Sequence, residues 1–349
     1  MPDVAFAVPG DLNAPTGGYA YDRRIIAELT RLGWNVRLLA LPGDFPEPSE
    51  ASVAATLKTF ADVPPAVPIL VDGLAFGAMP AEALREAERT FTALVHHPLG
   101  LETGLTVERS RQLLVTEKAA LTQAAAIIVT SRATAEILAA DFGAASERIT
   151  VAVPGVERSA RAAGSSSGNP PRLLAVGSLI PRKGYDVLVE ALRQTGDLPW
   201  TCRIAGAADR APETANQITR QIEEAGLGGR ITLVGALSDQ EIADEYVSAD
   251  IFVLASHFEG YGMVFTEALA RGLPIVACAG GATAQTVPAD AGILVGPGDA
   301  TGFSLALRRL LTDPKERRRL ADAAWAHASG LPTWQEAALR VSKVLETLS

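Results

Sequence analysis

Short apolar runs alternate with longer amphipathic segments along most of the chain, and this alternation is what most restricts its fold. In the first part of the sequence the runs are apolar at nearly every position, and segments with helical spacing follow most of them. Strands that are apolar on both faces belong to sheets covered on both sides. The order therefore predicts an α/β domain with a parallel, doubly wound sheet. We expect strands at 4–8, 35–41, 65–73, 91–95, 126–131 and 149–155, and helices at 19–32, 80–90, 106–124 and 132–141.

The alternation stops once and then starts again. Residues 157–171 are rich in Gly, Ser and Pro and have no periodicity, which is typical of a linker. The sequence contains 349 residues, enough for two domains of ordinary size. We therefore predict two Rossmann-like domains facing a cleft, at 1–160 and 172–330, joined by a linker at 161–171. In the second domain we expect strands at 172–178, 201–207, 231–237, 250–256, 274–280 and 293–296, helices at 184–194, 212–226, 238–248 and 263–271, and a helical C-terminal segment.

Composition excludes some kinds of partner. Lys and Arg number 31 against 40 Asp and Glu, a formal net charge of −9, which argues against binding to a nucleic-acid polymer. Cys202 and Cys278 lie in apolar strand runs and form neither a disulfide framework nor a zinc site. No window approaches 18 uninterrupted apolar residues, and the N-terminus lacks a secretory pattern. We expect a cytoplasmic protein with at most peripheral membrane contact.

The most informative segment for function is residues 256–277. Glu259 and Glu267 lie eight positions apart and flank a Gly-x-Gly turn that opens a helix. Free amides at the start of a helix suit an anionic or polyhydroxyl ligand. A carboxylate can accept two hydrogen bonds from a vicinal diol, so the pair could hold the ribose and the hexose of a nucleotide sugar. The alternative is that Glu259 caps the helix and Glu267 faces solvent.

Two adjacent cations follow the first strand of the second half. Arg182 and Lys183 come after a proline, precede Gly184 and a helix, and lie within reach of the Glu259 loop. Arg as a planar fork and Lys as a point charge can together hold a diphosphate. The alternative interpretation is a solvated basic loop.

Two further groups lie in the first half. His96 and His97 end a buried strand run, and Gly17 and Gly18 precede a helix, where the backbone could approach a phosphate closely. The alternatives are a structural histidine and an ordinary turn. Adjacent side chains on a strand diverge, and no His/Asp/Glu cluster completes a site, so we expect no metal.

The motifs together resemble the family-4 retaining glycosyltransferases of the GT-B fold. The segments E-G-Y-G-M-V-F-T-E at 259–267 and R-K-G-Y-D-V-L-V-E-A-L at 182–192, the early G-G-Y and the H-P-L motif at 97–99 occur in the family's order, and the likeness covers nearly the whole sequence. The resemblance implies that Glu259 contacts the sugar hydroxyls and that Glu267 contacts the ribose. It also implies that Gly260, Tyr261, Gly262 and Met263 line the sugar and phosphate, and that Arg182, Lys183 and the backbone of Gly17 and Gly18 neutralise the diphosphate.

The resemblance carries expectations for the first domain as well. It implies that this domain takes the acceptor, that the helix at 333–349 packs back onto it, and that His97 is the family's histidine, with His96 one position earlier as the alternative. The sequence departs from the family at 206–210, where GAADR replaces a Gly-Asp-Gly type of turn and leaves base recognition open.

We therefore expect transfer of a sugar from a nucleoside-diphosphate sugar to a hydroxyl of a glycan, lipid or small-molecule acceptor, with retention of anomeric configuration. The expected catalytic residues are His97, His96 and Glu259, with no cofactor and no metal. The alternatives are a glycosidase, a nucleotide-sugar epimerase on the same fold, and a nucleotide-sugar binding protein without activity.

Overall fold

The structure is a computed structural model that describes residues 1–166 and 168–348. Ser167 of the predicted linker and Ser349 of the predicted C-terminal helix lie outside the described residues. The protein divides into two compact units. Unit 1 comprises Met1–Gly155 and the C-terminal segment from Pro332, and unit 2 comprises Val156–Leu331.

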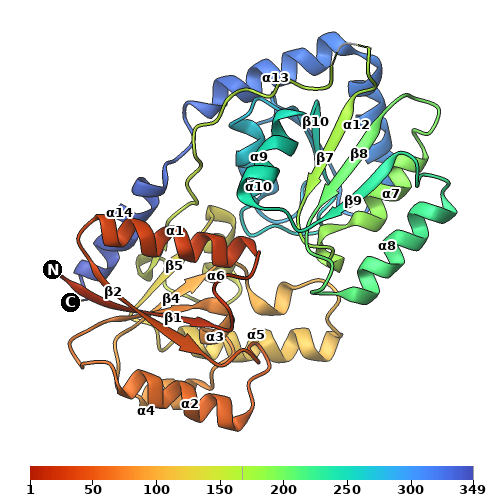
Figure 1. Ribbon diagram of the computed structural model, residues 1–349. Helices are drawn as coiled ribbons and strands as arrows, with labels where there is room; N and C mark the ends of the chain where they lie inside the picture. Colours follow the sequence, from red (N-terminus) through yellow and green to blue (C-terminus); the bar gives the residue numbers. More distant parts are fainter. Residues whose placement is uncertain (167, 349) are drawn as a thin grey trace. The chain divides into compact units, whose positions relative to one another are not determined.

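Unit 1 is built on a six-stranded parallel sheet with the order β2-β1-β3-β4-β5-β6. Helices α1, α6 and α14 lie on one face of this sheet, and α2, α4 and α5 lie on the other (Figure 1). The strands are β1 (Asp3–Pro9), β2 (Asn35–Leu41), β3 (Ile69–Asp72), β4 (Phe91–Val95), β5 (Ala126–Val129) and β6 (Ile149–Val151). The helices are α1 (Gly17–Arg31), α2 (Glu50–Ala61), α3 (Gly73–Phe76), α4 (Ala81–Glu86), α5 (Val107–Leu121), α6 (Arg132–Ala140) and α14 (Trp334–Glu346).

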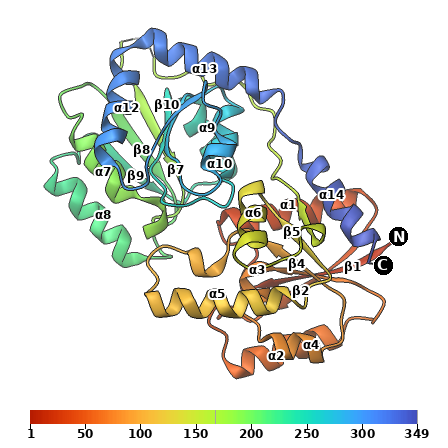
Figure 2. The same cartoon turned by 180° about the vertical axis from the view of Figure 1, so that it is seen from behind.

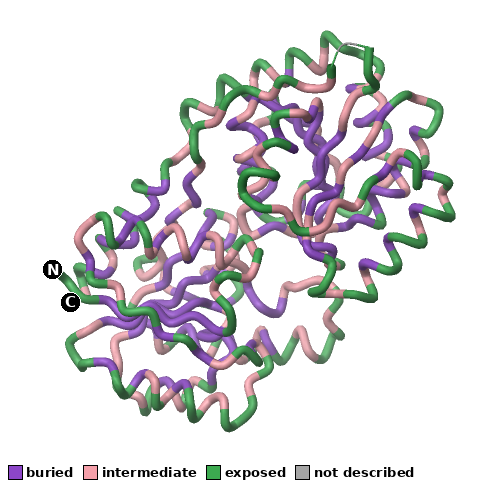
Figure 3. Tube along the Cα trace, viewed as in Figure 1, coloured by how far each residue is buried: buried purple, intermediate pink, exposed green. Residues whose placement is uncertain are grey.

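The core of unit 1 explains which segments form strands. All residues of β3 and β4 are buried, as expected for strands covered on both faces. Phe91 on β4 packs against Phe60 and Phe76, with ring centroids 5.2 and 5.9 Å away, and this aromatic group joins the sheet to α2 and α3. Figure 3 shows the same pattern in both units, with buried residues concentrated along the strands.

Helix α2 was not predicted, although Val53, Leu57 and Phe60 are spaced as on one face of a helix and contact the core of unit 1. Only Thr56 and Phe60 are buried on it. Its start is instead specified by a cap, since the Ser49 hydroxyl accepts a hydrogen bond from the Ser52 amide at 3.2 Å.

Unit 2 contains a second six-stranded parallel sheet, with the order β12-β11-β10-β7-β8-β9. Helices α7, α8 and α12 cover one face, and α9 and α10 lie on the other (Figure 2). The strands are β7 (Arg172–Val176), β8 (Thr201–Ala205), β9 (Ile231–Gly235), β10 (Ile251–Leu254), β11 (Ile275–Cys278) and β12 (Gly292–Val295). The helices are α7 (Tyr185–Arg193), α8 (Pro212–Glu224), α9 (Asp239–Val247), α10 (Met263–Leu269), α11 (Thr283–Thr286), α12 (Ala300–Thr312) and α13 (Pro314–Ala328). Cys202 and Cys278 are buried and free.

The C-terminal helix belongs to unit 1. Helix α14 lies beside α1, where the indole nitrogen of Trp34 donates to the Ser342 hydroxyl at 2.9 Å (Figure 1). The rings of Tyr21 and Trp334 meet edge to face with centroids 5.7 Å apart. The Tyr21 hydroxyl also donates to the Ala152 carbonyl at 2.8 Å, just before the chain leaves unit 1. The chain therefore lies against α1 both where it leaves unit 1 after Gly155 and where it returns at Pro332.

The Gly- and Ser-rich stretch at 157–171 is hydrogen-bonded to unit 2, in contrast to the free linker that its composition suggests. The amide of Ala162 donates to the carbonyl of Arg271, and that of Ala163 donates to Val247, both at 2.8 Å. The Asp250 carboxylate accepts from the amides of Ser165 at 3.2 Å and Arg172 at 2.8 Å. The described part of the expected linker at 161–171 is thus held by hydrogen bonds that its composition does not reveal, and the division between the units falls at residue 155.

Among the described residues, no helix combines the length and apolar character needed to cross a membrane.

Candidate functional site

In unit 2, a close backbone approach brings the two predicted cations to the end of β10. Arg182 and Lys183 lie in a 3₁₀ turn, Pro181–Lys183, that follows β7. Gly184 ends this turn with φ +60°, and a Cβ at this position would overlap the Ala255 carbonyl oxygen. Only glycine allows the turn to lie this close to the loop that leaves β10. The cations consequently face residues 256–259.

The carboxylate of Glu259 lies between these cations. Its Oε1 accepts from Lys183 Nζ at 2.7 Å and from the Ser256 hydroxyl at 2.6 Å, and its Oε2 is 3.2 Å from Arg182 Nη1. Arg182 Nη1 also donates to the Phe258 carbonyl at 2.8 Å. Burial alone would raise the pKa of Glu259, but Lys183 and Arg182 hold that pKa at about 2. The group is therefore a carboxylate with two cationic partners, carrying one net positive charge.

The second glutamate has a different partner. Gly262 has φ +86°, and a Cβ there would lie 2.5 Å from the Phe265 ring, so the Gly-x-Gly turn depends on glycine just before α10. Glu267 is one turn along this helix, and its Oε2 accepts from the Tyr246 hydroxyl at 2.9 Å. The guanidinium of Arg271 lies over the Tyr246 ring, 4.6 Å from its centroid. Glu267 is therefore held in place and does not simply face solvent.

The other residues of unit 2 that were predicted to bind the nucleotide sugar form the turn between the two glutamates. Gly260 and Tyr261 lie in the turn, and Met263 is the first residue of α10. The Tyr261 carbonyl accepts from the Thr286 hydroxyl at 2.7 Å, which fixes the turn against α11. The N-cap of α10 is Gly262, which has no side chain to cap the helix, and Glu259 is directed at Arg182 and Lys183 instead. The amides at the start of α10 remain suited to an anionic ligand.

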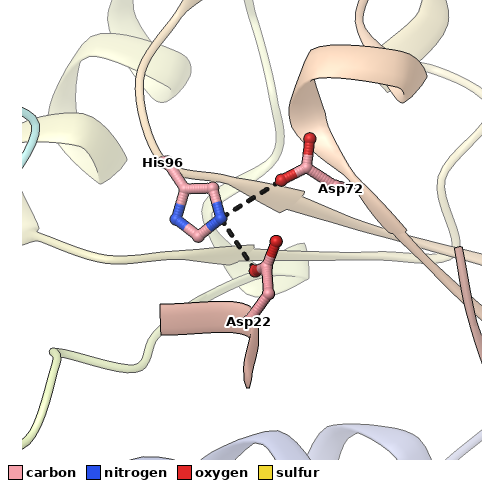
Figure 4. A group of neighbouring side chains, drawn as sticks. All are labelled: Asp22, Asp72 and His96. Carbon is pink, nitrogen blue, oxygen red and sulfur yellow. Dashed lines mark hydrogen bonds and ion pairs between the residues drawn. The ribbon is translucent and has the colours of Figure 1, made fainter. Parts of the chain in front are cut away.

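In unit 1, His96 and two aspartates form a cluster at the carboxyl edge of the sheet. Figure 4 shows one ring nitrogen of His96 directed at both carboxylates and the other directed away from them. His96 Nε2 donates to Asp22 Oδ1 at 3.0 Å and lies 3.3 Å from Asp72 Oδ2. Asp22 comes from α1, Asp72 ends β3 and His96 follows β4.

Burial and mutual charge set the protonation of this cluster. Asp22 is 0% exposed and Asp72 2% exposed. Burial would lower the pKa of His96, but Asp22 and Asp72 raise it to about 10. Burial raises the pKa of Asp22 to about 7, against the attraction of His96 and with the added repulsion of Asp72. At neutral pH His96 is therefore an imidazolium, whose second nitrogen carries a proton that it can donate.

The cluster corrects one argument drawn from the sequence. No His/Asp/Glu cluster was expected at the histidines, yet one ligand atom from each of Asp22, Asp72 and His96 lies within 4.8 Å of the others. The expectation failed because α1, β3 and β4 are distant in the sequence and adjacent at the sheet edge. Carboxylates and imidazole are also the ligand types of divalent cations.

His96 and His97 have different partners in the structure, and Gly18 lies against the His96 ring. His97 Nε2 lies 3.9 Å from Glu102 Oε2, whereas His96 is the centre of the buried cluster. Gly17 and Gly18 form the first turn of α1, capped by Thr16. A Cβ on Gly18 would lie 3.2 Å from the His96 ring, and one on Gly17 would meet nothing within 4 Å. Gly18 thus leaves room for His96, a role that its sequence context did not indicate.

Glu117 is a further residue that sequence reasoning missed. It lies on α5, is fully buried, and its Oε2 accepts from the Leu99 amide at 2.8 Å. Burial raises the pKa of Glu117 to about 8, while the bond to Leu99 opposes that rise. A charged residue type on the buried face of a helix was the available signal. Glu117 fixes the turn that follows His96 and His97.

Comparison with known proteins decides the family of unit 2. Residues 156–326 match the family model described as "Glycosyl transferases group 1". Unit 2 is a group 1 glycosyltransferase domain. Within this glycosyltransferase domain lie Arg182, Lys183, Glu259 and Glu267, whereas the cluster around His96 lies outside the matched residues.

Curated relatives extend the likeness beyond the glycosyltransferase domain. A D-inositol 3-phosphate glycosyltransferase of Xylanimonas cellulosilytica is 34% identical over 231 residues, which cover 61% of this protein and 54% of the relative. An MMP alpha-(1->4)-mannosyltransferase of Mycolicibacterium hassiacum is 28% identical over 277 residues, 73% of this protein and 64% of the relative. The matched part of the sequence spans little more than half the length of most of these curated relatives.

Solved structures match the whole protein in fold. A sucrose-phosphate synthase from Thermosynechococcus elongatus has a TM-score of 0.84 at 23% identity, covering 99% of both proteins. The Anabaena protein HepE, in complex with UDP and glucose, has a TM-score of 0.79 at 20% identity, covering 99% of this protein and all of HepE. Two parallel six-stranded sheets with flanking helices, together with these likenesses, confirm the predicted GT-B architecture.

Proposed function

We propose that the protein transfers a sugar from a nucleoside-diphosphate sugar to an acceptor hydroxyl, with retention of anomeric configuration. The observation that carries this proposal is the group of half-buried Arg182 and Lys183 around the buried Glu259 at the carboxyl edge of the unit 2 sheet. Ligands of open α/β sheets bind at this edge. A net positive group there, in a group 1 glycosyltransferase domain, suits the diphosphate of a sugar donor.

Arg182 and Lys183 stabilise the negative charge that develops on the departing diphosphate, together with the amides of residues 261–263. Glu267, held by Tyr246, accepts hydrogen bonds from the ribose hydroxyls. The leaving phosphate takes the proton of the attacking hydroxyl, so the reaction needs no protein nucleophile. Both side-chain cations are supplied by the protein, and we propose that neither a metal nor another cofactor is required.

His96, rather than His97, is the proposed catalytic histidine. The two carboxylates keep the imidazole protonated, so it acts as a hydrogen-bond donor to the substrate rather than as a general base. Gly18 makes room for the His96 ring. We assign the acceptor to unit 1, which carries His96.

Relatives suggest where to begin the search for donor and acceptor. These relatives include inositol 3-phosphate glycosyltransferases and a GDP-mannose-dependent mannosyltransferase, and HepE has a solved structure in complex with UDP-glucose. A hydroxyl-rich acceptor, with or without phosphate, is therefore the first class to test. The free, buried Cys202 and Cys278 support a reducing compartment such as the cytoplasm.

The deciding experiment is a thermal-shift screen against UDP-, GDP- and ADP-sugars, followed by transfer assays with inositol, inositol phosphate and simple glycosides. Specific stabilisation identifies the donor. We expect Arg182→Ala and Lys183→Ala to lose most of the transfer activity. Wild-type turnover in both variants would refute the assignment, and conversion of the donor with no acceptor present would instead indicate an epimerase.

A further inference from the structure

We infer that a pocket in unit 1, between α2 and α5, takes an uncharged apolar group carried by the acceptor. The pocket has a volume of about 690 Å³. This volume lies within the range of roughly 300–1,000 Å³ that is usual for small-molecule sites. The inference rests on the proposed function, because it names a chemical class for the acceptor of that transfer.

The position of the pocket relates it to the histidine cluster. Its walls include segments that follow β2 and β3, at the carboxyl edge of the sheet that also carries His96. Helix α3 makes the connection, since Asp72, which lies 3.3 Å from His96, accepts from the Leu74 amide at the start of this helix. Ala78 lines the pocket just beyond the end of α3. At the rise of a helix, Asp72 and Ala78 lie roughly 9 Å apart.

Much of the pocket lining is apolar and belongs to the fixed part of the fold. Val53 and Leu57 of α2 line the pocket together with Leu113 of α5, and all three also contact the core of unit 1. Ala54 lines the pocket from an exposed position on α2. An apolar ligand that covers these side chains removes both their surface and its own from water.

One arginine joins the two sides of the pocket. The Arg109 guanidinium, on α5, donates to the Pro46 carbonyl and to Gln112 Oε1, both at 2.9 Å. Its Nε lies 3.2 Å from Glu47 Oε1. These contacts tie α5 to the segment that follows β2. The positive charge of Arg109 is thus already compensated by a carboxylate of the same pocket.

The charge of the lining selects the kind of apolar group. Among the described lining residues, Glu47, Glu50 and Arg109 are charged, which leaves one net negative charge. An anionic ligand would be repelled, whereas a neutral alkyl or aryl group would not. The acceptor therefore has a hydroxyl-bearing head for the side of His96 and an uncharged tail for this pocket.

Two fluorescent probes test the pocket without any transfer. N-phenylnaphthylamine is apolar and uncharged, and anilinonaphthalene sulfonate is its anionic counterpart. The wild type should bind the uncharged probe about tenfold or more tightly than the anionic one. Ala54→Trp, which fills the pocket from an exposed position, should lose this binding. Ala55→Trp, at the next exposed position and outside the lining, is the matched control and should keep it.

Two results of the probe experiment would overturn the inference. One is equal binding of the uncharged probe by Ala54→Trp and the wild type. The other is a wild-type dimer that is lost in Ala54→Trp, which would show that a second copy of the protein covers the pocket. Because both substitutions replace exposed alanines of α2, a matching Tm for the two variants excludes a difference in folding.

Methyl and octyl forms of the same glycoside connect the pocket to transfer. The octyl form should have a KM about tenfold or more below that of the methyl form, since burial of two methylene groups already gives about this factor. Ala54→Trp should lose this advantage and keep the wild-type kcat with the methyl form, whereas Ala55→Trp should keep both. Equal KM values in the wild type would overturn the inference and leave the proposed function intact. Absence of transfer to every acceptor is the separate failure of the proposed function.

Discussion

His96 and Asp22 lie 74 positions apart in the sequence, yet the imidazole Nε2 donates to the aspartate Oδ1 at 3.0 Å. Because Asp22 is fully buried, the imidazolium replaces the water that would otherwise stabilise its charge. Through this bond, the first helix of unit 1 holds the histidine that follows β4. The protonation of His96 is therefore decided by a residue far from it in the sequence.

Replacing Asp22 with asparagine should lower the pKa of His96 from about 10 by at least one unit, because one of two neighbouring negative charges is lost. Ring-proton NMR against pH measures this directly. His327, which pairs with Asp290 in unit 2, provides an internal control whose signals should not change. An unaltered titration of His96 would show that Asp22 does not set its charge.

Glu117 should make unit 1 less stable as the pH rises. Its pKa is raised from 4.5 to about 8 in the folded state, so its contribution is fully present below pH 4.5 and is lost as the pH rises through about 8. Glu117→Gln retains an acceptor for the Leu99 amide but cannot ionise. The difference in free energy of unfolding between the variant and the wild type should shift in favour of the variant by about 5 kcal/mol from pH 4.5 to pH 8. Denaturant unfolding at pH 4.5, 6.5 and 8.5 tests this, and parallel curves for the two proteins would contradict it.

Gly184→Ala should be far more damaging than Gly226→Ala. Both glycines have positive φ, +60° and +69°, so both alanines incur roughly 1 kcal/mol of backbone strain. A Cβ on Gly226 meets nothing within 4 Å, whereas one on Gly184 would overlap the Ala255 carbonyl oxygen. We expect Gly184→Ala to lose several further degrees in Tm and most nucleoside-diphosphate affinity, because the turn bearing Arg182 and Lys183 must move. Equal effects of the two substitutions would contradict this explanation.

Removing metal ions should leave transfer unchanged. Arg182 and Lys183 already supply positive charge for the leaving group, and the charge on His96 offsets one of the two carboxylates of its cluster. Activity is compared before and after dialysis against a chelator, with and without added Mg²⁺, Mn²⁺ or Zn²⁺. Loss of transfer on chelation, restored by one ion in the wild type but not in Asp22→Asn, would instead identify a metal at Asp22, Asp72 and His96.

Local sequence patterns predicted most of the fold. The strands at 35–41 and 91–95 were predicted with the bounds that the structure gives them, because their apolar runs end in clear polar or proline signals. Helix α2 was missed although Val53, Leu57 and Phe60 have helical spacing. The stretch around Ala162 was interpreted as a linker because its backbone hydrogen bonds to Arg271 and Val247 leave no mark on composition.

The candidate site was only partly accessible from sequence. Arg182, Lys183 and Glu259 were predicted to lie within reach of each other, since each follows a strand of one parallel sheet and such strands end at one edge. Asp22, Asp72 and Tyr246 were not identified. Each acts on a residue 20 or more positions away, and the pairing depends on how distant elements pack.

The return of the chain to unit 1 at Pro332 has a consequence for synthesis on the ribosome. Tyr21 emerges early, but Trp334, the ring that it meets, emerges only after all of unit 2. At ordinary elongation rates this delay is on the order of 15–60 s. During that time the nascent α1 face stays bare, while unit 2 has its entire sequence and can fold first. Unit 1, although it begins the sequence, is therefore the last to be completed.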